Sequence, residues 1–156
     1  MIRVLFVCLG NICRSPMAEY VFKDMVKKRN LSDKFYIASA GTSDEEAGNG
    51  VHRGTKSKLK EVGIDTSEKR AVQLKKEDYS RFDYIIGMEK SNLFSMERIF
   101  GGDPEHKVMR LLDLASHPRD IADPWYTGNF DKTYEDVYEG CQILLEHICE
   151  REGISC

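Results

Sequence analysis

A cysteine and an arginine near the N-terminus have the types and the spacing for phosphoryl transfer. Cys8 directly follows the apolar run 2–7, and Arg14 comes six residues later. A thiolate is a strong nucleophile, and a guanidinium fork can hold two phosphate oxygens at once. The pattern therefore predicts covalent phosphatase chemistry without a metal ion, in which sulfur attacks phosphorus. A buried cysteine with an unrelated surface arginine is the alternative, because this spacing alone often arises by chance.

The neighbouring residues predict that this pair lies where a strand ends and a helix begins. The run 2–7 is continuous and rich in β-branched and aromatic residues, as in a strand covered on both faces. Pro16 suits a first helical turn, and apolar residues then recur at helical spacing, which predicts a helix over 16–29. In an open parallel sheet this edge binds ligands, and N–H groups at a helix start favour anions.

The loop between these two elements suits an anion that touches the backbone. Gly10 permits a close backbone approach or a left-handed turn. A helix N-terminus and a nearby arginine both favour the thiolate form of a cysteine, and the Ser15 hydroxyl can donate to that thiolate. Arg14 and the loop amides would stabilise charge on the phosphate oxygens in the transition state. The nucleotide-binding pattern GxxxxGK[ST] is absent, so the loop is not of that type.

Asp123 is the candidate for the proton transfers of such a reaction. It precedes Pro124 in a long loop, and Trp125 and Tyr126 follow. Phenolate leaves poorly unless it is protonated, so an acid is needed beside the leaving oxygen. An aspartic acid among aromatic rings can give that proton and then act as a base on the water that hydrolyses the intermediate. A turn aspartate before proline is the common alternative.

The rest of the chain alternates predicted strands with predicted helices. We expect strands over 34–41, 82–88 and 106–112, and helices over 53–62, 90–99 and 132–152, with a long loop over 115–131. This alternation predicts βαβ units, and hence an α/β fold with a parallel sheet and helices on both faces. No repeat or linker divides the chain, so we expect a single domain over 1–156.

Composition and charge narrow the classes of partner. The chain has 23 basic and 26 acidic residues among 156, and a net charge of −3, so no global basic field invites nucleic acid. No run approaches the roughly 20 apolar residues that span a bilayer, and the N-terminus lacks a signal-peptide layout. We therefore expect a cytoplasmic protein that binds neither nucleic acid nor membranes.

The cysteines predict thiols rather than a metal site. There are five, with no CxxC pair and no histidine pattern nearby, so we expect no zinc site and no other metal. In a reducing compartment all five should be thiols. We interpret Cys141 and Cys149 as small residues in or beside a helical core, and Cys156 as a free terminal thiol.

The segment FVCLGNICRSPMAE at 6–19, followed by DPWYTG at 123–128, resembles the low-molecular-weight protein tyrosine phosphatase family. The likeness covers essentially the whole chain, including SAGTSD at 39–44 and FDYIIGMEKSNL at 82–93. It implies a four-stranded parallel sheet of doubly wound type. It also implies hydrolysis of phosphotyrosine in proteins without metal or cofactor, and we expect a monomer.

The resemblance also assigns roles to individual residues. It makes Cys8 the nucleophile, Arg14 the phosphate clamp and Asp123 the general acid and base. Asn11 would brace the loop, Ser39 would bond to Asn11, and Ser15 would support the thiolate. Cys13 would be able to trap oxidised Cys8 as a disulfide and so protect it from irreversible oxidation. The residues expected to bind substrate are Leu9, Gly10, Asn11, Ile12, Cys13, Ser15, Trp125 and Tyr126.

Three features depart from the family pattern or bear on specificity. The family commonly has a histidine after the Gly-Ile turn, whereas 63–73 has none and offers Glu68 or Lys69 nearby. The usual DPYY is DPWY here. The loop carrying Asp44, Glu45 and Glu46 suggests a preference for substrates with basic neighbours, with a solvated loop as the alternative. We interpret the four histidines, His52, His106, His117 and His147, as surface residues.

Three other functions differ from phosphotyrosine hydrolysis in the residues that they need. Related phosphoarginine phosphatases carry threonine at the position of Ile12 and lack the aromatic pair after the Asp-Pro step. Related arsenate reductases need a further cysteine pair in mid-chain, and none lies between Cys13 and Cys141. A non-catalytic phosphate or redox sensor would use Cys8 and Cys13 as a thiol switch, but would have no use for Asp123.

Overall fold

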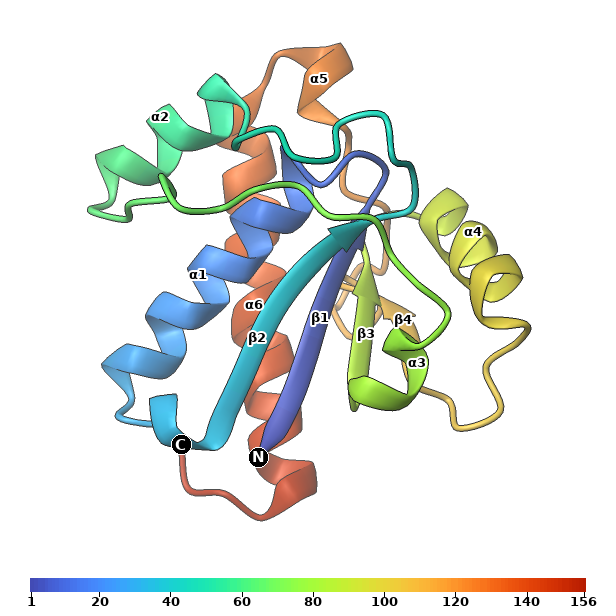
Figure 1. The fold of residues 1–156 in the computed structure, drawn as a ribbon. Coiled ribbons are helices and arrows are strands. Elements are labelled where there is room, and N and C mark those ends of the chain that lie inside the picture. Colours follow the sequence, from blue (N-terminus) through green and yellow to red (C-terminus); the bar gives the residue numbers. More distant parts are fainter.

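A four-stranded parallel sheet forms the centre of the computed structural model, which describes all residues 1–156 (Figure 1). The strand order is β2-β1-β3-β4, and every neighbouring pair runs parallel. The strands are β1 (Ile2–Cys8), β2 (Phe35–Gly41), β3 (Tyr84–Gly87) and β4 (Val108–Arg110). This order confirms the doubly wound α/β sheet that the sequence and its family resemblance predicted.

Helices cover both faces of the sheet (Figure 1). The two helices α1 (Arg14–Lys28) and α6 (Phe130–Glu152) pack together on one face, and α4 (Lys90–Phe100) lies on the other. The shorter helical segments are η1 (Ser32–Lys34), α2 (Arg53–Glu61), α3 (Asp78–Arg81) and α5 (Pro124–Thr127). None of the helices combines the length and the apolar character needed to cross a lipid bilayer.

The central strand β1 explains why both faces must be covered. Phe6 and Cys8 point into the larger core beneath α1 and α6, while Leu5 and Val7 point into the smaller core on the α4 side. All four side chains are buried. Because successive strand residues face opposite sides, an unbroken apolar run fits only a strand covered twice. The carboxyl end of this buried strand delivers Cys8 to the edge of the sheet.

Several element ends differ from the sequence prediction. The helix expected from residue 16 begins at Arg14, and β3 and β4 are shorter than 82–88 and 106–112. Leu111 and Leu112 are buried in the larger core although they follow β4 in a turn. An apolar run reports burial, and it cannot by itself distinguish a strand from a buried turn. The long loop also contains α5, and α6 begins two residues earlier than expected.

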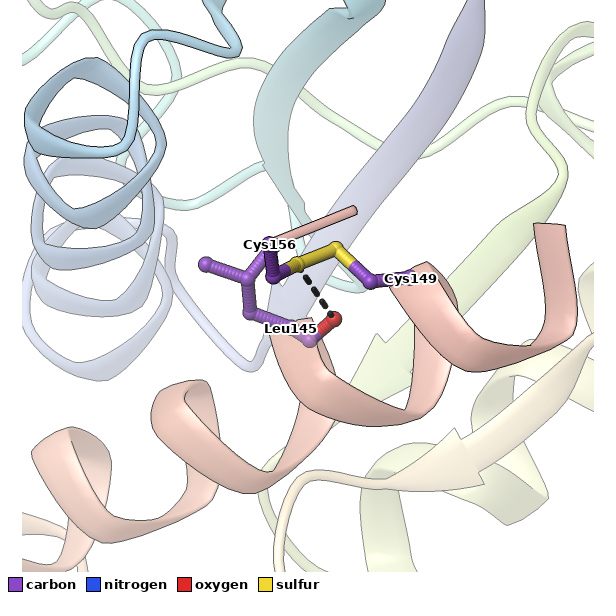
Figure 2. The surroundings of a disulfide bond; sticks show 3 residues. All are labelled: Leu145, Cys149 and Cys156. Carbon is purple, nitrogen blue, oxygen red and sulfur yellow. Dashed lines mark hydrogen bonds between the residues drawn. A yellow bond between two sulfur atoms is a disulfide. The ribbon is translucent and has the colours of Figure 1, made fainter. Parts of the chain in front are cut away.

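The expectation that all five cysteines are thiols is wrong in this structure. Cys149 and Cys156 form a disulfide (Figure 2). Gly153 ends α6 in the left-handed conformation, and the chain then turns back so that Cys156 reaches the helix. The sequence pattern does not show this reversal, so it predicts a free terminal thiol at Cys156. Cys8, Cys13 and Cys141 are free and buried.

Gly41, at the end of β2, allows the segment after β1 to lie directly against it. A Cβ atom at this position would stand 2.9 Å from the Leu9 carbonyl oxygen and 3.1 Å from the Asn11 nitrogen. Both contacts are backbone atoms and cannot rotate away. We expect Gly41→Ala to lower the free energy of unfolding by about 1–3 kcal/mol, measured by urea denaturation.

Gly50→Ala is the matched control for this change. A Cβ atom there would meet only the end of the Arg70 side chain, at 3.4 Å. Its free energy of unfolding should stay within about 0.5 kcal/mol of the wild type. Equal urea midpoints for the two variants would show that β2 and the segment after β1 are not in close contact.

Candidate active site

The sulfur of Cys8 lies inside the turn that joins β1 to α1. It accepts a hydrogen bond from the backbone N–H of Asn11 at 3.3 Å, and its distance to Ser15 Oγ is 3.0 Å. Ser15 Oγ already accepts from Asn11 Nδ2 at 2.8 Å. The hydroxyl proton of Ser15 is therefore left to point at the sulfur, which suits a thiolate.

Hydrogen bonds turn the carbonyl groups of this loop outward. Four loop carbonyls accept from the segment after β2, and the pairs are Thr42 N to Cys8 O at 2.9 Å, Ser43 N to Leu9 O at 2.9 Å, His52 N to Ile12 O at 2.8 Å and Thr55 Oγ1 to Cys13 O at 3.1 Å. In a trans peptide the C=O and the next N–H point in opposite directions. Turning the carbonyls outward therefore directs the loop amides inward, toward the sulfur.

Asn11 fixes the shape of the loop. Its backbone adopts the left-handed conformation with φ 58°, which asparagine tolerates better than most residues. Its Nδ2 also donates to Ser39 Oγ at 2.9 Å, and its Oδ1 accepts from Val72 N at 3.0 Å. The side chain is buried and uses both of its polar atoms.

The start of α1 adds further donors for an anion. No side chain caps this helix, so its first N–H groups have no competing partner of that kind. Arg14 is the first residue of the helix, and only 2% of its surface is exposed. Together, the loop amides, the helix start and one guanidinium surround the sulfur with hydrogen-bond donors.

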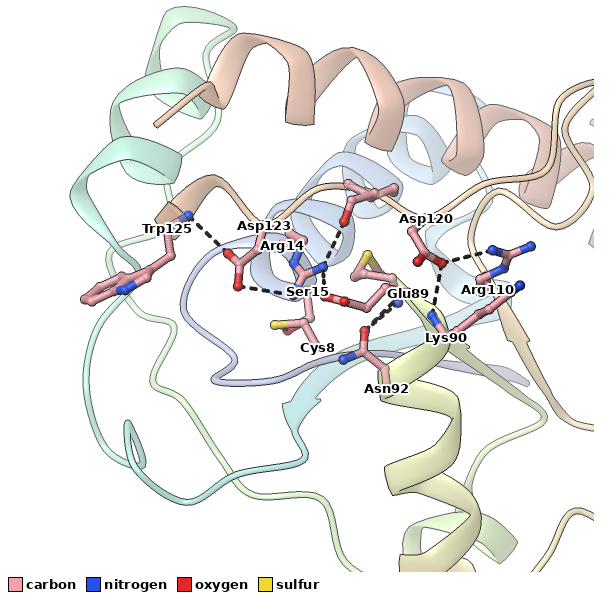
Figure 3. A network of polar contacts seen from close by, with 12 residues as sticks. Cys8, Arg14, Ser15, Glu89, Lys90, Asn92, Arg110, Asp120, Asp123 and Trp125 are labelled. Atoms are coloured by element: carbon pink, nitrogen blue, oxygen red, sulfur yellow. Dashed lines mark hydrogen bonds and ion pairs between the residues drawn. The ribbon is translucent and has the colours of Figure 1, made fainter. Parts of the chain in front are cut away.

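The Arg14 guanidinium is held between two carboxylates (Figure 3). It pairs with Glu89, and its Nη2 lies 3.3 Å from Asp123 Oδ2. Its Nη1 also donates to the carbonyl of Ile121 at 2.8 Å. Sequence reasoning missed Glu89, although one signal was present: the residue lies just beyond β3, at the same sheet edge as Cys8.

The loop that carries Asp123 is fastened to the same edge. Ile121 N donates to Met88 O at 2.9 Å, and the Asp120 carboxylate accepts from Lys90 N and from Arg110 (Figure 3). Asp123 itself caps α5, because its Oδ1 accepts from the N–H of Trp125 at 3.1 Å. Its other oxygen faces Arg14, so the carboxyl has a defined direction at the mouth of the loop.

A cavity of about 150 Å³ opens above the sulfur. Most of the residues expected to contact substrate line it, and these are Leu9, Gly10, Ile12, Cys13, Trp125 and Tyr126, together with Cys8, Arg14 and Asp123. Asn11 and Ser15 are not in this lining, because they are buried beneath the loop. Both therefore lie where they can support the loop rather than touch a ligand.

Three cavity residues come from the segment after β2. Ser43, Glu45 and Glu46 line the rim, whereas Asp44 does not. The sequence pattern places Glu45 and Glu46 in an acidic loop but gives no signal for Ser43. A preference for basic neighbours in the substrate stays a prediction, and it now concerns two carboxylates rather than three.

Cys13 is the second thiol of the loop. Burial raises the pKa of Cys13 to about 12, with further increases from the negative charges of Cys8 and Asp123 and an opposing effect from Arg14. At neutral pH this thiol therefore keeps its proton. A disulfide between Cys8 and Cys13 stays a prediction, since both sulfurs are free in this structure.

His52 has a structural role that its interpretation as a surface residue missed. Its ring stacks on Phe130 at 5.3 Å and meets the edge of Trp125 at 5.5 Å, between ring centres. Its Nδ1 accepts from Gly54 N at 3.0 Å and so caps α2. His52 thus connects the loop, through its bond to Ile12, with the aromatic wall of the cavity.

Lys69, and not Glu68, reaches the back of the loop. Its Nζ donates to the carbonyl oxygen of Ser39 at 3.0 Å. Lys69 therefore supplies a polar partner on this side of the loop, although the family's usual histidine is absent. The sequence could not decide between the two residues, because the segment 62–77 has no long regular element that would fix its register.

Comparison with known proteins shows the family of this chain. The sequence model of a protein family, described as low molecular weight phosphotyrosine protein phosphatase, matches residues 3–153 of this chain. The low molecular weight protein-tyrosine-phosphatase YfkJ of Bacillus subtilis is 43% identical over 150 residues, which cover 95% of this chain and 96% of that protein. The low molecular weight phosphotyrosine protein phosphatase of Sus scrofa is 42% identical, over 93% of this chain and 94% of that protein.

Solved structures of related phosphatases have the same fold as this chain. The crystal structure of YfkJ from Bacillus subtilis matches with a TM-score of 0.93 and 42% identity, over 97% of this chain and 96% of that chain. The Drosophila arginine phosphatase matches with a TM-score of 0.86 and 32% identity, over 93% and 96%. Because the family model covers nearly the whole chain and the fold is the same, the chain belongs to the low molecular weight phosphotyrosine protein phosphatase family.

Proposed function

We propose that this protein hydrolyses phosphotyrosine in proteins through a cysteinyl-phosphate intermediate and without a metal ion or cofactor. The observation that carries the proposal is a single cavity that three residues line together: Cys8, Arg14 and Asp123. These supply a nucleophile, an anion clamp and a proton donor within one site. A cytoplasmic location and a monomeric state stay predictions.

In the first step the Cys8 thiolate attacks phosphorus and forms the sulfur–phosphorus bond. The bond from phosphorus to the tyrosine oxygen breaks, and Asp123 gives its proton to that oxygen. In the second step water attacks phosphorus, and the Asp123 carboxylate takes a proton from it. The sulfur–phosphorus bond breaks, which regenerates the thiolate and releases inorganic phosphate.

The loop stabilises both the thiolate and the phosphoryl group. The inward amides and Arg14 face the position of the three equatorial oxygens, where charge is shared in the transition state. Arg14 is buried and is oriented by the Ile121 carbonyl and by Glu89, so little reorganisation accompanies binding. The outward carbonyls keep the amides aimed at one point.

Phosphotyrosine is favoured over other phosphoryl groups by the cavity walls. Leu9 and Ile12 come from the loop, and Trp125 and Tyr126 stand on the α5 side, so a flat ring finds apolar surface in the cavity. Phosphoarginine is the second candidate, because the Drosophila arginine phosphatase has the same fold. Ile12 and the two aromatic residues distinguish this chain from that class, as the sequence indicated.

Cys8→Ser should abolish turnover. We expect kcat for p-nitrophenyl phosphate in the presence of EDTA to fall at least about 1,000-fold, because the serine hydroxyl does not supply the thiolate. The variant should still bind inorganic phosphate, measured by calorimetry, since the amides and Arg14 are unchanged. Hydrolysis by Cys8→Ser at a rate close to that of the wild type would disprove the covalent route. A wild type without turnover would favour a non-catalytic phosphate or redox sensor.

Asp123→Asn tests the proton donor without removing the helix cap, because asparagine also caps helices well. We expect kcat to fall about 100- to 1,000-fold and the limb of the pH profile that reports loss of the acid proton to disappear. Asp131→Asn, the same change at an exposed carboxylate paired with Lys58, is the control and should leave kcat unchanged. An unaltered alkaline limb in Asp123→Asn would assign the acid to another residue.

Substrate preference separates the two candidate activities. We expect kcat/KM for a phosphotyrosine peptide to exceed that for phosphoarginine or phosphoserine in the same sequence by at least about tenfold, since ring burial contributes on the order of 2 kcal/mol. Ile12→Thr should narrow this difference. Faster hydrolysis of the phosphoarginine peptide by the wild type would reverse the assignment and leave the cysteine chemistry intact.

A further inference from the structure

A largely buried ion pair lies behind the loop and has no part in the mechanism above. Glu19, on α1, is 4% exposed, and its Oε1 lies 3.5 Å from Lys69 Nζ. The same Oε1 accepts a hydrogen bond from Ser39 Oγ, with 2.5 Å between the two oxygens. A carboxylate and an ammonium group with so little exposed surface are costly to bury unless their hydrogen bonds are satisfied, so the pair calls for a functional explanation.

Glu19 and Lys69 hold two polar groups of Ser39. Glu19 takes the side-chain hydroxyl, and Lys69 Nζ donates to the backbone carbonyl at 3.0 Å. Ser39 belongs to β2, Glu19 to α1 and Lys69 to the segment between α2 and α3. Two separate parts of the chain therefore hold one serine of β2.

The direction of each hydrogen bond from Ser39 to the sulfur follows from Glu19. A carboxylate only accepts, so the Ser39 hydroxyl must donate to it, and the oxygen of Ser39 is then left to accept from Asn11 Nδ2. The other Nδ2 proton of Asn11 goes to Ser15 Oγ. The Ser15 proton is thereby left for the Cys8 sulfur, at 3.0 Å.

Lys69 also acts through its positive charge, in addition to its hydrogen bond with Ser39. Burial lowers the pKa of Lys69, and the negative charges of Glu19 and Cys8 oppose that decrease. Its cation therefore pairs with Glu19, at 3.5 Å, and its charge also favours the negative form of Cys8. Without it, Glu19 would place a less compensated negative charge behind the sulfur.

We propose that Glu19 and Lys69 are positioning residues for the nucleophile: Glu19 orients the hydrogen bonds that run through Ser39, Asn11 and Ser15 to Cys8, and Lys69 holds Ser39 and compensates the charge. This inference rests on the proposed function in taking Cys8 as the nucleophile. Neither residue touches the cavity above the sulfur, so both act through the loop.

Lys23 offers a matched control. Its Nζ lies 2.5 Å from the other oxygen of Glu19, but its side chain is 41% exposed, against 12% for Lys69. Water screens the charge of an exposed lysine, and Lys23 has no contact with Ser39. Removing Lys23 should therefore take away only the solvent-exposed partner of Glu19 and leave its hydrogen bond with Ser39 unchanged.

The test follows the alkylation of Cys8 by iodoacetamide as a function of pH, with Cys8→Ser as the blank. The other thiols interfere little at acidic pH, because burial raises the pKa of Cys13 to about 12 and also raises the pKa of Cys141. We expect Lys69→Met to shift the midpoint upward by about one pH unit, and to lower kcat/KM for p-nitrophenyl phosphate below that midpoint by about tenfold. Lys69→Arg should recover most of the wild-type behaviour, and Lys23→Met should shift the midpoint by less than about 0.3 units.

Glu19→Gln should shift the pH midpoint of Cys8 alkylation in the opposite direction to Lys69→Met. Its amide oxygen can still accept from Ser39, but the negative charge is gone, so the midpoint should move downward. A role limited to stability would lower the unfolding temperature of both variants without opposite shifts. Equal midpoints in the wild type and Lys69→Met, or shifts of the same sign in Lys69→Met and Glu19→Gln, would overturn the inference.

The two proposals can fail separately. If the wild type hydrolyses p-nitrophenyl phosphate but Lys69→Met matches it in midpoint and in kcat/KM, the positioning pair is wrong and the proposed function stands. If the wild type does not turn over, the proposed function fails, and the alkylation midpoints still test the pair. Lys69→Gln, which keeps a donor for the Ser39 carbonyl without a charge, replaces Lys69→Met if that variant does not fold.

Discussion

The structure depends on one constraint: the peptides after Cys8 must turn their carbonyls outward so that their amides meet at the sulfur. No residue of the loop can do this alone. The carbonyls are held by N–H and hydroxyl groups of the segment 42–55, and Gly41 leaves the room for that segment and the loop to meet. Asn11 completes the turn by adopting a left-handed backbone and anchoring its side chain to β2 and to Val72. An anion site results whose donors are oriented before any anion binds.

The doubly wound topology explains how distant residues reach this one loop. Because β1 lies between β2 and β3, the loop after β1 has a neighbouring strand end on each side. From the β2 side come Ser39 and the carbonyl anchors, which fix the backbone. From the β3 side comes Glu89, which with Ile121 fixes the Arg14 side chain. Backbone and guanidinium are thus positioned by opposite sides of the sheet, and each side can be altered by mutation without removing the other.

The sequence predicted what local patterns encode. The buried strand, the helix after it and the Cys8–Arg14 spacing are contiguous, and the placement of Asp123 beside aromatic residues lies within one short segment. The partners that meet through distant elements or through irregular segments carry no such local signal: Glu89 at Arg14, His52 against the edge of Trp125, Lys69 at Ser39 and Cys156 at Cys149. Each joins residues that no periodicity connects, and two of them depend on chain reversals in irregular segments.

Charge explains why so many carboxylates surround a site for a dianion. Arg14 is paired with Glu89 and Asp123, which keeps a buried guanidinium compensated. A phosphoryl group that binds beneath Arg14 would take the place of Asp123 as its partner, and the carboxyl would then be free to face the leaving oxygen. Glu89 would stay, because it comes from the fixed start of α4. Substrate binding and release of the acid from its ion pair are in this view one event, and the arginine couples them.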